Sequence, residues 1–578
     1  MQAMVLSMAA AGLRSHPPLR VLAGMGRRRF CWPGLSGLAA LAMLGGLCSA
    51  TVQAQPQAAA AVAALAASAA PMSAPAAATL ETGWPPLPTS AAVAARFSAP
   101  PVRYAVPALA PGRATPTSQA ELSEWLAKTV AMARPPTRIR LRRPGTSQLG
   151  VPIEALHFSR GPDRPLALLI GQQHGNEPAG AEALLVLARE LAEGPLGEVL
   201  DKLDVLLLPR ANPDGALFDR RLSATKLDIN RDHLLLRSPE SRAIAWLARP
   251  QRPVLVVDSH EYTAVGHYAA KFDALPRADL QFQPATDPNL PAVIDEAAMA
   301  WFITPLQAGL ELAGLHSDWY HTNAPDPADL RIRMGSWQPD VARNVFGLRH
   351  AVSLLVESRG IGLGPWHLGR RVHSQVVALR LVLHQAAQHA QALQALQAQA
   401  DAQVAAAACH GQLVLQAAAT HQQRSLILLD PDTGADKPLQ VAWESALQLQ
   451  PLRSRARPCG YWLASDQDLA VYTLRALGVV VQRLHTDTLL RTQAWVTADD
   501  GPDAQPVVVS ELRSAALQAP AGSHYVAMDQ PLANLAAAAL EPDTAYSFYS
   551  NSLIDRLDAA RRVVAPLARG VAGAGLSR

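Results

Sequence analysis

Four short, almost continuous apolar runs set the strongest constraint on how this chain folds. They cover residues 166–170, 205–208, 254–257 and 352–356, and helical patterns lie between several of them, as at 178–191 and 239–248. Runs without polar alternation are typical of strands buried on both faces, and strands that alternate with helices form largely parallel sheets. The sequence therefore predicts an α/β fold, with a mixed, largely parallel central sheet flanked by helices.

The first segment, residues 1–54, has the pattern of a secretory signal peptide. Three consecutive arginines precede an apolar stretch and a small-residue cleavage site at 52–54, and initiation at Met25 suits this pattern better than Met1. Leu47 before Cys48 argues against a lipid anchor. We expect an exported protein, periplasmic or secreted, without a stable membrane anchor after cleavage.

Net charge and hydropathy limit the classes of partner that the chain is expected to bind. The formal net charge of +4 falls to −1 when the five arginines of the signal segment are removed, so nothing favours nucleic acid or an acidic membrane as a partner. No later apolar run reaches the roughly 20 residues that span a bilayer.

Composition divides the rest of the chain into four parts. Residues 55–117 are rich in alanine and proline, which predicts an unordered linker. A capping-box pattern at Ser118 predicts that an ordered domain begins there and extends to about residue 378. An alanine- and glutamine-rich stretch at 379–408 predicts one long connecting helix, and short β-like runs from residue 409 predict a smaller α+β accessory domain at 409–578.

Two cysteines follow the signal segment. Cys409 and Cys459 are 50 positions apart. In an oxidising compartment they can form a disulfide, and two buried free thiols fit the sequence about as well.

The segment after the first apolar run carries two residue types that bind metals. His174 and Glu177 lie three positions apart, where a turn leads into a helix that begins at Pro178. An imidazole and a carboxylate at this spacing can share one zinc ion, with bonds of about 2 Å. The pair alone is weak evidence for a metal site, because it equally fits a buried histidine beside a helix-capping glutamate.

A second histidine follows the third apolar run. With His260, the set becomes two histidines and one carboxylate, which leaves one position of a tetrahedral zinc ion open to water, as in catalytic sites. Asp258 and Glu261 are candidates to orient a ligating imidazole, and each also fits a surface charge.

The fourth apolar run ends in a carboxylate. Glu357 directly follows residues 352–356, where burial is costly unless the side chain has a partner or a function. Beside a zinc-activated water it would serve as a general base. The alternative is a salt bridge to Arg359 or another neighbour.

Arginines lie in a turn-rich stretch between the two histidine segments. Arg221 follows a turn at 209–215, and Asn230 and Arg231 follow it nine and ten positions later. An Asn-Arg pair can hold a carboxylate, and a separate arginine can stabilise an oxyanion, although each alone fits a surface ion pair. The candidates gather at the carboxyl ends of predicted strands, where open α/β sheets place their sites.

In order along the chain, these residues resemble the motifs of the carboxypeptidase A-like zinc metallopeptidases. The motifs are His-Gly-Asn-Glu at 174–177, Asn-Pro-Asp-Gly at 212–215, Asp-Ile-Asn-Arg at 228–231, Ser-His at 259–260, and Glu357. The resemblance covers about residues 118–378 and points to a bacterial exported member. The succinylglutamate desuccinylase and aspartoacylase branch shares these motifs.

The resemblance implies a role for each matching residue. It assigns one Zn²⁺ per chain to three ligands: His174, Glu177 and His260. Glu357 would take a proton from a zinc-activated water and deliver it to the leaving amine. Arg221 would stabilise the oxyanion, and Asn230 and Arg231 would bind the terminal carboxylate of the substrate.

The chain departs from the family pattern in two places. The family carries a tyrosine about twenty residues before the catalytic glutamate, whereas here Trp337 and Arg343 occupy that stretch and Tyr320 is the candidate substitute for substrate binding. Lys226 stands where a glycine usually precedes the Asp-x-Asn-Arg motif. These changes leave the hydrolytic residues intact and argue against ordinary carboxypeptidase specificity.

The predicted function is a zinc metallocarboxypeptidase that hydrolyses the C-terminal amide bond of peptides. The nearer alternative is a zinc amidohydrolase of N-acyl amino acids, or of cell-wall peptides. A more distant alternative is an inactive module that binds carboxylates, which retention of all three ligands and Glu357 disfavours. The expected partner is a peptide or N-acyl amino acid with a free carboxylate, and the oligomeric state stays open.

Overall fold

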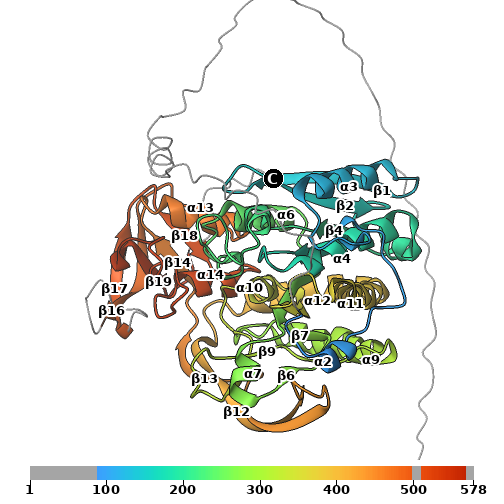
Figure 1. Cartoon of the computed structure of the whole chain (residues 1–578). Coiled ribbons are helices and arrows are strands. Elements are labelled where there is room, and N and C mark those ends of the chain that lie inside the picture. The colour runs from blue at the N-terminus through green and yellow to red at the C-terminus, as the bar shows by residue number, and fades with distance from the viewer. Residues whose placement is uncertain (1–86, 498–508, 568–578) are drawn as a thin grey trace, which may run out of the picture. The chain divides into compact units, whose positions relative to one another are not determined.

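The computed structural model describes residues 87–497 and 509–567 (Figure 1). The predicted signal peptide and the first part of the predicted linker, residues 55–86, lie outside the described residues. Within the described ranges, no helix is both long enough and apolar enough to cross a membrane.

The central sheet has eight strands in the order β1-β2-β4-β3-β5-β11-β7-β8. Their bounds are β1 Arg138–Thr146, β2 Pro152–Ser159, β3 Leu166–Gly171, β4 Asp204–Leu208, β5 Leu255–Thr263, β7 Leu280–Pro284, β8 Ser317–Trp319 and β11 Val352–Ile361. The four predicted apolar runs form the adjacent strands β4, β3, β5 and β11, which are parallel to one another. The predicted mixed, largely parallel sheet is confirmed.

Alternate residues of the central strands face two separate cores. Ala167 and Leu169 of β3 pack in one core, and Leu168 and Ile170 pack in the other. The helices α3 (Gln119–Ala131), α4 (Pro178–Glu193) and α11 (Leu368–Gln388) contribute to the first core, and α6 (Pro239–Ala248) and α10 (Ala342–Leu348) to the second. Burial on both faces explains why these strands lack polar alternation.

The predicted unordered linker is wrong for residues 87–117. This segment contains the short helices α2 (Ala91–Ala95) and Pro107–Leu109. Phe97 is buried, and the Arg359 guanidinium lies 4.1 Å from the centre of its ring. Composition alone predicts no order here, but a few apolar residues, such as Val93 and Phe97, pack against distant parts of the chain.

The predicted single helix at 379–408 is two helices. The first, α11, begins earlier, at Leu368, and the second, α12, covers Ala390–Ala406. They are separated at His389, whose ring stacks on Trp301 with ring centres 4.7 Å apart. The repetitive sequence contains no proline or glycine that would predict this break. The stacking of His389 on Trp301 is a tertiary contact at the same position.

The region from residue 409 begins with a long β-hairpin rather than a set of short strands. Its strands, β12 (Gln412–Leu429) and β13 (Asp436–Ala456), join three strands from the preceding region in a five-stranded sheet of order β6-β12-β13-β10-β9. Those three are β6 (Leu275–Pro276), β9 (His321–Asn323) and β10 (Ile332–Met334). The buried Trp443 of β13 packs beside His321, with ring centres 5.3 Å apart. The hairpin therefore shares its core with the predicted catalytic region.

A six-stranded antiparallel sheet forms the remainder, in the order β15-β18-β14-β19-β16-β17. Its bounds are β14 Gly460–Leu463, β15 Gln482–Arg483, β16 Thr488–Thr497, β17 Val509–Ala519, β18 His524–Ala527 and β19 Ala560–Val563. The helices α13 (Asp468–Ala476) and α14 (Ala533–Leu540) pack on it. This agrees with the predicted α+β composition at the C-terminal end.

Cys409 and Cys459 form a disulfide, which decides between the two alternatives that the sequence leaves open. The bond closes a loop of 50 residues that contains the whole β12–β13 hairpin. A cross-link of this length restricts the unfolded chain strongly.

We expect that changing both cysteines to serine lowers the free energy of unfolding by about 2–4 kcal/mol, because the unfolded chain regains the entropy of the open loop. Urea unfolding of the parent protein with and without reductant measures the effect. Reductant should leave the double variant unchanged. Labelling of Cys409 or Cys459 in the unreduced parent by a thiol reagent in denaturant would contradict the disulfide.

Asp287 is buried and accepts a hydrogen bond from the Asn289 backbone N–H at 2.8 Å. Burial raises the pKa of its carboxyl to about 7. Because this folded-state pKa exceeds the unfolded value of about 3.9, its contribution to stability is full below pH 4 and is lost as pH rises to 7.

For Asp287→Asn, we expect an advantage in unfolding free energy over the parent that grows by up to about 1.4 kcal/mol per pH unit between pH 4 and 7. Above pH 7 the advantage should stay constant. Chemical denaturation of both proteins at several pH values measures it, and an advantage independent of pH would contradict the buried carboxylate.

Candidate metal centre

Three potential metal ligands come together where two parallel strands lie side by side. His174 and Glu177 lie in the turn between β3 and α4, and His260 lies on β5, which pairs directly with β3. All three side chains are buried, and one ligand atom of each lies within 4.8 Å of the others. The structure thus brings together the residues that the sequence predicts as zinc ligands.

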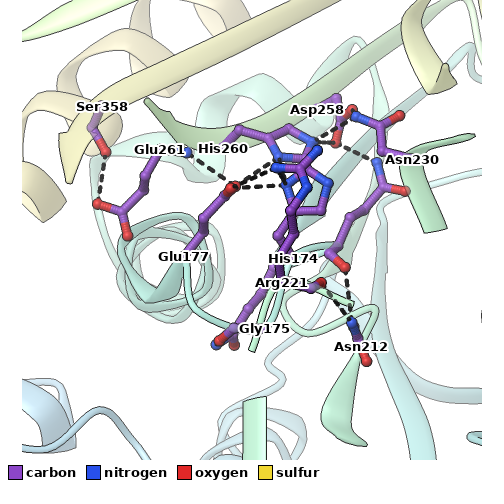
Figure 2. Close-up of polar contacts among 12 residues, drawn as sticks. His174, Gly175, Glu177, Asn212, Arg221, Asn230, Asp258, His260, Glu261 and Ser358 are labelled. Carbon is purple, nitrogen blue, oxygen red and sulfur yellow. Dashed lines mark hydrogen bonds and ion pairs between the residues drawn. The ribbon is translucent and has the colours of Figure 1, made fainter. Parts of the chain in front are cut away.

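The converging atoms have the spacing of a metal's ligands. Nδ1 of His260 lies 3.0 Å from Nδ1 of His174 and 2.8 Å from Oε2 of Glu177, and Oε1 of Glu177 lies 2.8 Å from Nδ1 of His174 (Figure 2). Ligands of a tetrahedral zinc ion with bonds of about 2.0–2.1 Å are about 3.3 Å apart. The three groups therefore fit one zinc ion with small movements.

Carboxylates behind the imidazoles decide which nitrogen faces the centre. Nε2 of His174 lies 3.1 Å from Asp228 Oδ1, and Nε2 of His260 lies 2.9 Å from Asp258 Oδ1. Ionised carboxylates only accept hydrogen bonds, so Asp228 and Asp258 favour a hydrogen on each Nε2 and leave each Nδ1 directed at the Glu177 carboxylate. A metal ion between these groups would replace the proton on Nδ1 and be bound by two imidazole nitrogens and one carboxylate, a donor set that suits zinc.

Asp258 orients His260, as the sequence suggests, and is itself held in place. Gln173 Nε2 donates to Asp258 Oδ1 at 2.6 Å, and Asn230 Nδ2 donates to Asp258 Oδ2 at 3.1 Å. Gln173 also contacts His233 Nε2 through its amide oxygen at 2.7 Å. A chain of buried hydrogen bonds therefore fixes the imidazole of His260.

Glu261, the other candidate for orienting an imidazole, does not have that role. Its carboxylate pairs with Arg371 at 2.7 and 2.8 Å and is directed toward Ser358, away from the two imidazoles (Figure 2). Successive strand residues point to opposite faces, so Glu261 faces away when His260 faces the centre. Only its backbone N–H contributes, by donating to Glu177 Oε2 at 3.1 Å.

Two loops approach closely to support the ligand turn. A Cβ on Gly175 would lie 1.9 Å from the backbone carbon of Gly215, so only glycine fits there. Asn212 caps the short helix α5 (Pro213–Leu217) by accepting from Gly215 N at 2.8 Å, and its amide donates to the Gln173 carbonyl at 3.1 Å. The Asn-Pro-Asp-Gly motif thus holds the turn that carries the ligands.

Glu357 lies on β11 directly opposite His260 in the parallel register. It is buried, and no arginine, lysine or histidine within the described ranges forms an ion pair with it. Arg359 lies over Phe97 instead, so the alternative of a salt bridge between Glu357 and Arg359 is wrong. Burial, together with the nearby charge of Glu177, raises the pKa of the Glu357 carboxyl to about 8.

A cavity of about 450 Å³ opens onto the metal centre. The predicted site residues that line it are His174, Glu177, Arg221, Asn230, Arg231, Tyr320 and Glu357. Arg221 is anchored by Asp228 through Nη2 at 2.8 Å, and its Nη1 lies 3.2 Å from Nδ1 of His174. This places a fixed cation beside the ligands, where charge on a reacting oxygen can be stabilised.

Asn230 and Arg231 differ in their availability to a ligand. The Asn230 amide already donates to Asp258, and its oxygen accepts from Ala342 N at 2.8 Å. The Arg231 side chain is 46% exposed, and its Nε lies 3.5 Å from Asp340 Oδ2. Arg231 is therefore the member of the pair with a guanidinium free to approach a ligand, whereas Asn230 braces the site.

Tyr320 lies between β8 and β9 and lines the same cavity. Its backbone N–H donates to the Phe282 carbonyl at 2.9 Å. Burial raises the pKa of its hydroxyl, so the side chain stays protonated and can donate a hydrogen bond.

Two residues of the site had no role assigned from the sequence. Asp228 belongs to the Asp-Ile-Asn-Arg motif and holds both His174 and Arg221, which its place in that motif could have suggested. Arg343 appears in the sequence only as a departure from the family pattern, yet it is buried and lines the cavity. Only the folded chain shows that α10 brings it there.

The sequence of this chain is similar to the sequences of known carboxypeptidases. The chain matches the model of the zinc carboxypeptidase family over residues 123–241. It is 29% identical over 396 residues to carboxypeptidase 2 of Trichophyton rubrum, covering 67% of this chain and 73% of that protein. It is 34% identical over 128 residues to carboxypeptidase SOL1 of Arabidopsis thaliana, covering 19% and 26%.

Among solved structures, the metallo-carboxypeptidase of Burkholderia cenocepacia is similar with a TM-score of 0.37 and 17% identity, covering 47% of this chain and 69% of that one. The segment that matches the family model contains the ligand turn at His174 and Glu177 and the arginine segment at Arg221 to Arg231. Over residues 123–241 the chain is thus similar to the zinc carboxypeptidase family, and over 396 residues to a fungal carboxypeptidase.

Proposed function

We propose that the chain is a metallocarboxypeptidase that hydrolyses the C-terminal amide bond of peptides in the 450 Å³ cavity. One observation carries the proposal: the Nδ1 atoms of two imidazoles and the Glu177 carboxylate converge beside Glu357, a buried carboxylate without an ion-pair partner among the described residues. The names of the relatives, carboxypeptidases from Trichophyton rubrum and Arabidopsis thaliana, support the same activity.

The proposed metal is one Zn²⁺ per chain, held by His174, Glu177 and His260. When bound, zinc polarises a carbonyl oxygen and makes a water molecule more acidic. Asp228 and Asp258 would keep the two Nδ1 lone pairs directed at the ion by accepting hydrogen bonds from the Nε2 atoms.

Glu357 is the proposed general base. A pKa raised by burial makes a carboxylate a stronger proton acceptor than it is in water, which suits transfer of a proton near neutral pH. The same side chain would then return the proton to the leaving amine. It pairs with His260 in the strand register and lines the same cavity as His174 and Glu177.

Three further residues would hold the substrate. Arg221, fixed by Asp228, would stabilise negative charge on the carbonyl oxygen as water adds. Arg231, braced by Asn230, would bind the terminal carboxylate, and Tyr320 would donate a hydrogen bond from the cavity wall. A requirement for a free carboxylate makes the cut an exopeptidase cut.

We also infer that the protein is exported. The Cys409–Cys459 disulfide supports this, because disulfides persist in oxidising compartments and are rare in the cytosol. The signal-peptide pattern at 1–54 points the same way.

We expect Glu357→Gln to lower kcat by about 10²–10⁴-fold because the amide cannot accept the proton. Release of C-terminal residues from short peptides, and of amino acids from N-acyl amino acids, measures activity. Metal analysis should find one zinc per chain in both the parent and the variant.

Two outcomes of that experiment would contradict the proposal. Turnover of N-acyl amino acids without turnover of peptides would indicate an amidohydrolase instead. Absence of zinc and of any turnover in the parent protein would indicate a binding module that has lost catalysis.

We expect Asp258→Asn to weaken zinc affinity by about 10–100-fold, because His260 loses the acceptor that fixes its tautomer. Competition with a chromophoric chelator measures the affinity. A matched control is Asp204→Asn, which alters a histidine–aspartate contact outside the site, between Asp204 and His157 at 3.1 Å. Equal zinc affinity in the Asp258 variant and the control would exclude the orienting role.

A further inference from the structure

The substrate cavity contains a buried cation without an anionic partner. This cation is Arg343, near the start of α10. The residue is only 3% exposed and lines the cavity. Its Nη2 donates to the Ser336 carbonyl, and its Nε is buried with no hydrogen-bond partner. Across the described residues, no aspartate or glutamate forms an ion pair with it.

The other three arginines that line this cavity each have an acidic partner. Arg221 pairs with Asp228 at 2.8 Å, and the nearest acidic contact of Arg231 is Asp340 at 3.5 Å. Arg333 pairs with both Asp329 and Glu444. Arg343 therefore differs from them in having no acidic partner among the described residues.

A buried guanidinium without a counter-ion is costly, because the protein replaces few of the hydrogen bonds that water gives it. Burial lowers the pKa of Arg343 only to about 10, so the group stays charged at neutral pH. An anionic ligand in the substrate cavity would neutralise this buried charge. A carboxylate suits the planar guanidinium, because the two can form paired hydrogen bonds.

The surroundings of Arg343 leave room for the guanidinium. A Cβ on Gly335 would lie 2.8 Å from both Arg343 Nη2 and Tyr320 Cδ1, so a larger residue there would displace one of them. The neighbouring Ala342 N–H donates to Asn230 Oδ1, which ties the first turn of α10 to the metal centre. Arg343 is thus fixed relative to the reacting groups.

A substrate with one carboxylate does not satisfy both available arginines. Arg231 belongs to the segment that follows Asp228, whereas Arg343 comes from α10 and is far more deeply buried. If Arg231 binds the terminal carboxylate, a neutral final side chain leaves Arg343 buried and unpaired after water is displaced. A second carboxylate on the final residue removes this penalty.

We propose that Arg343 binds the side-chain carboxylate of a C-terminal glutamate or aspartate, so that the enzyme preferentially releases acidic residues. The inference rests on the proposed carboxypeptidase function and adds the substrate class. Arg343 is here a specificity residue, without a part in the proton transfers.

The test compares three peptides that differ only in the last residue: glutamate, glutamine or leucine. For the zinc-loaded parent protein, we expect kcat/KM for the glutamate peptide to exceed that for the glutamine peptide by about 100-fold, because the amide does not neutralise the buried guanidinium. Glutamine has nearly the same shape, so the ratio isolates the charge.

Variants then test whether Arg343 causes the preference for glutamate over glutamine. Arg343→Met should lower kcat/KM for the glutamate peptide by about 100-fold and change the leucine peptide by only a few-fold. Arg343→Lys should keep a preference for glutamate over glutamine, because it keeps the charge. The matched control, Arg333→Met, removes a cavity arginine that Asp329 and Glu444 already neutralise, and should leave the glutamate-to-glutamine ratio unchanged.

Three results would overturn the inference. A parent protein that releases glutamate no faster than glutamine or leucine lacks the preference, whether or not the variants fold. An equal loss for all three peptides in Arg343→Met would mean that Arg343 binds the terminal carboxylate instead. Failure of the zinc-loaded parent to release any residue would overturn the proposed function and, with it, this substrate class.

Discussion

The parallel pairing of β5 with β3 on one side and with β11 on the other is the arrangement on which the site depends. The β3–β5 pairing places the turn that carries His174 and Glu177 beside the strand that carries His260. The β5–β11 register sets Glu357 directly opposite His260. Because backbone hydrogen bonds fix this register, a shift of one residue would turn either side chain to the other face of the sheet.

Electrostatics complete what the strand pairing begins. Asp228 and Asp258 lie beside the outer nitrogens of the two imidazoles, so that both Nδ1 atoms and the Glu177 carboxylate face one centre that a metal ion can occupy. Glu357, in contrast, is buried without an ion-pair partner among the described residues, which raises its pKa and suits it to accept a proton. Carboxylates of the same site thus have opposite tasks, because Asp228 and Asp258 are paired and Glu357 is not.

The region after residue 409 is tied to the cavity through shared structure. Its β12–β13 hairpin pairs with β10, and β10 pairs with β9, whose residues line the cavity. The hairpin is closed at its base by the Cys409–Cys459 disulfide. The cavity wall therefore depends on strands from both sides of residue 409, which gives the C-terminal region a structural part in the site.

The sequence by itself determined the α/β class, the four central strands and the three metal-ligand candidates, since these depend on local features: continuous apolar runs and the polar residues that follow them. Only the tertiary structure decided which side chains face the centre, as the opposite directions of His260 and Glu261 show. The break at His389, the packing of Phe97 and the disulfide depend likewise on partners far along the chain. Arg343 is the clearest case, because an arginine has the same sequence signature on the surface as in a cavity, and burial without a counter-ion arises only when α10 packs against the site.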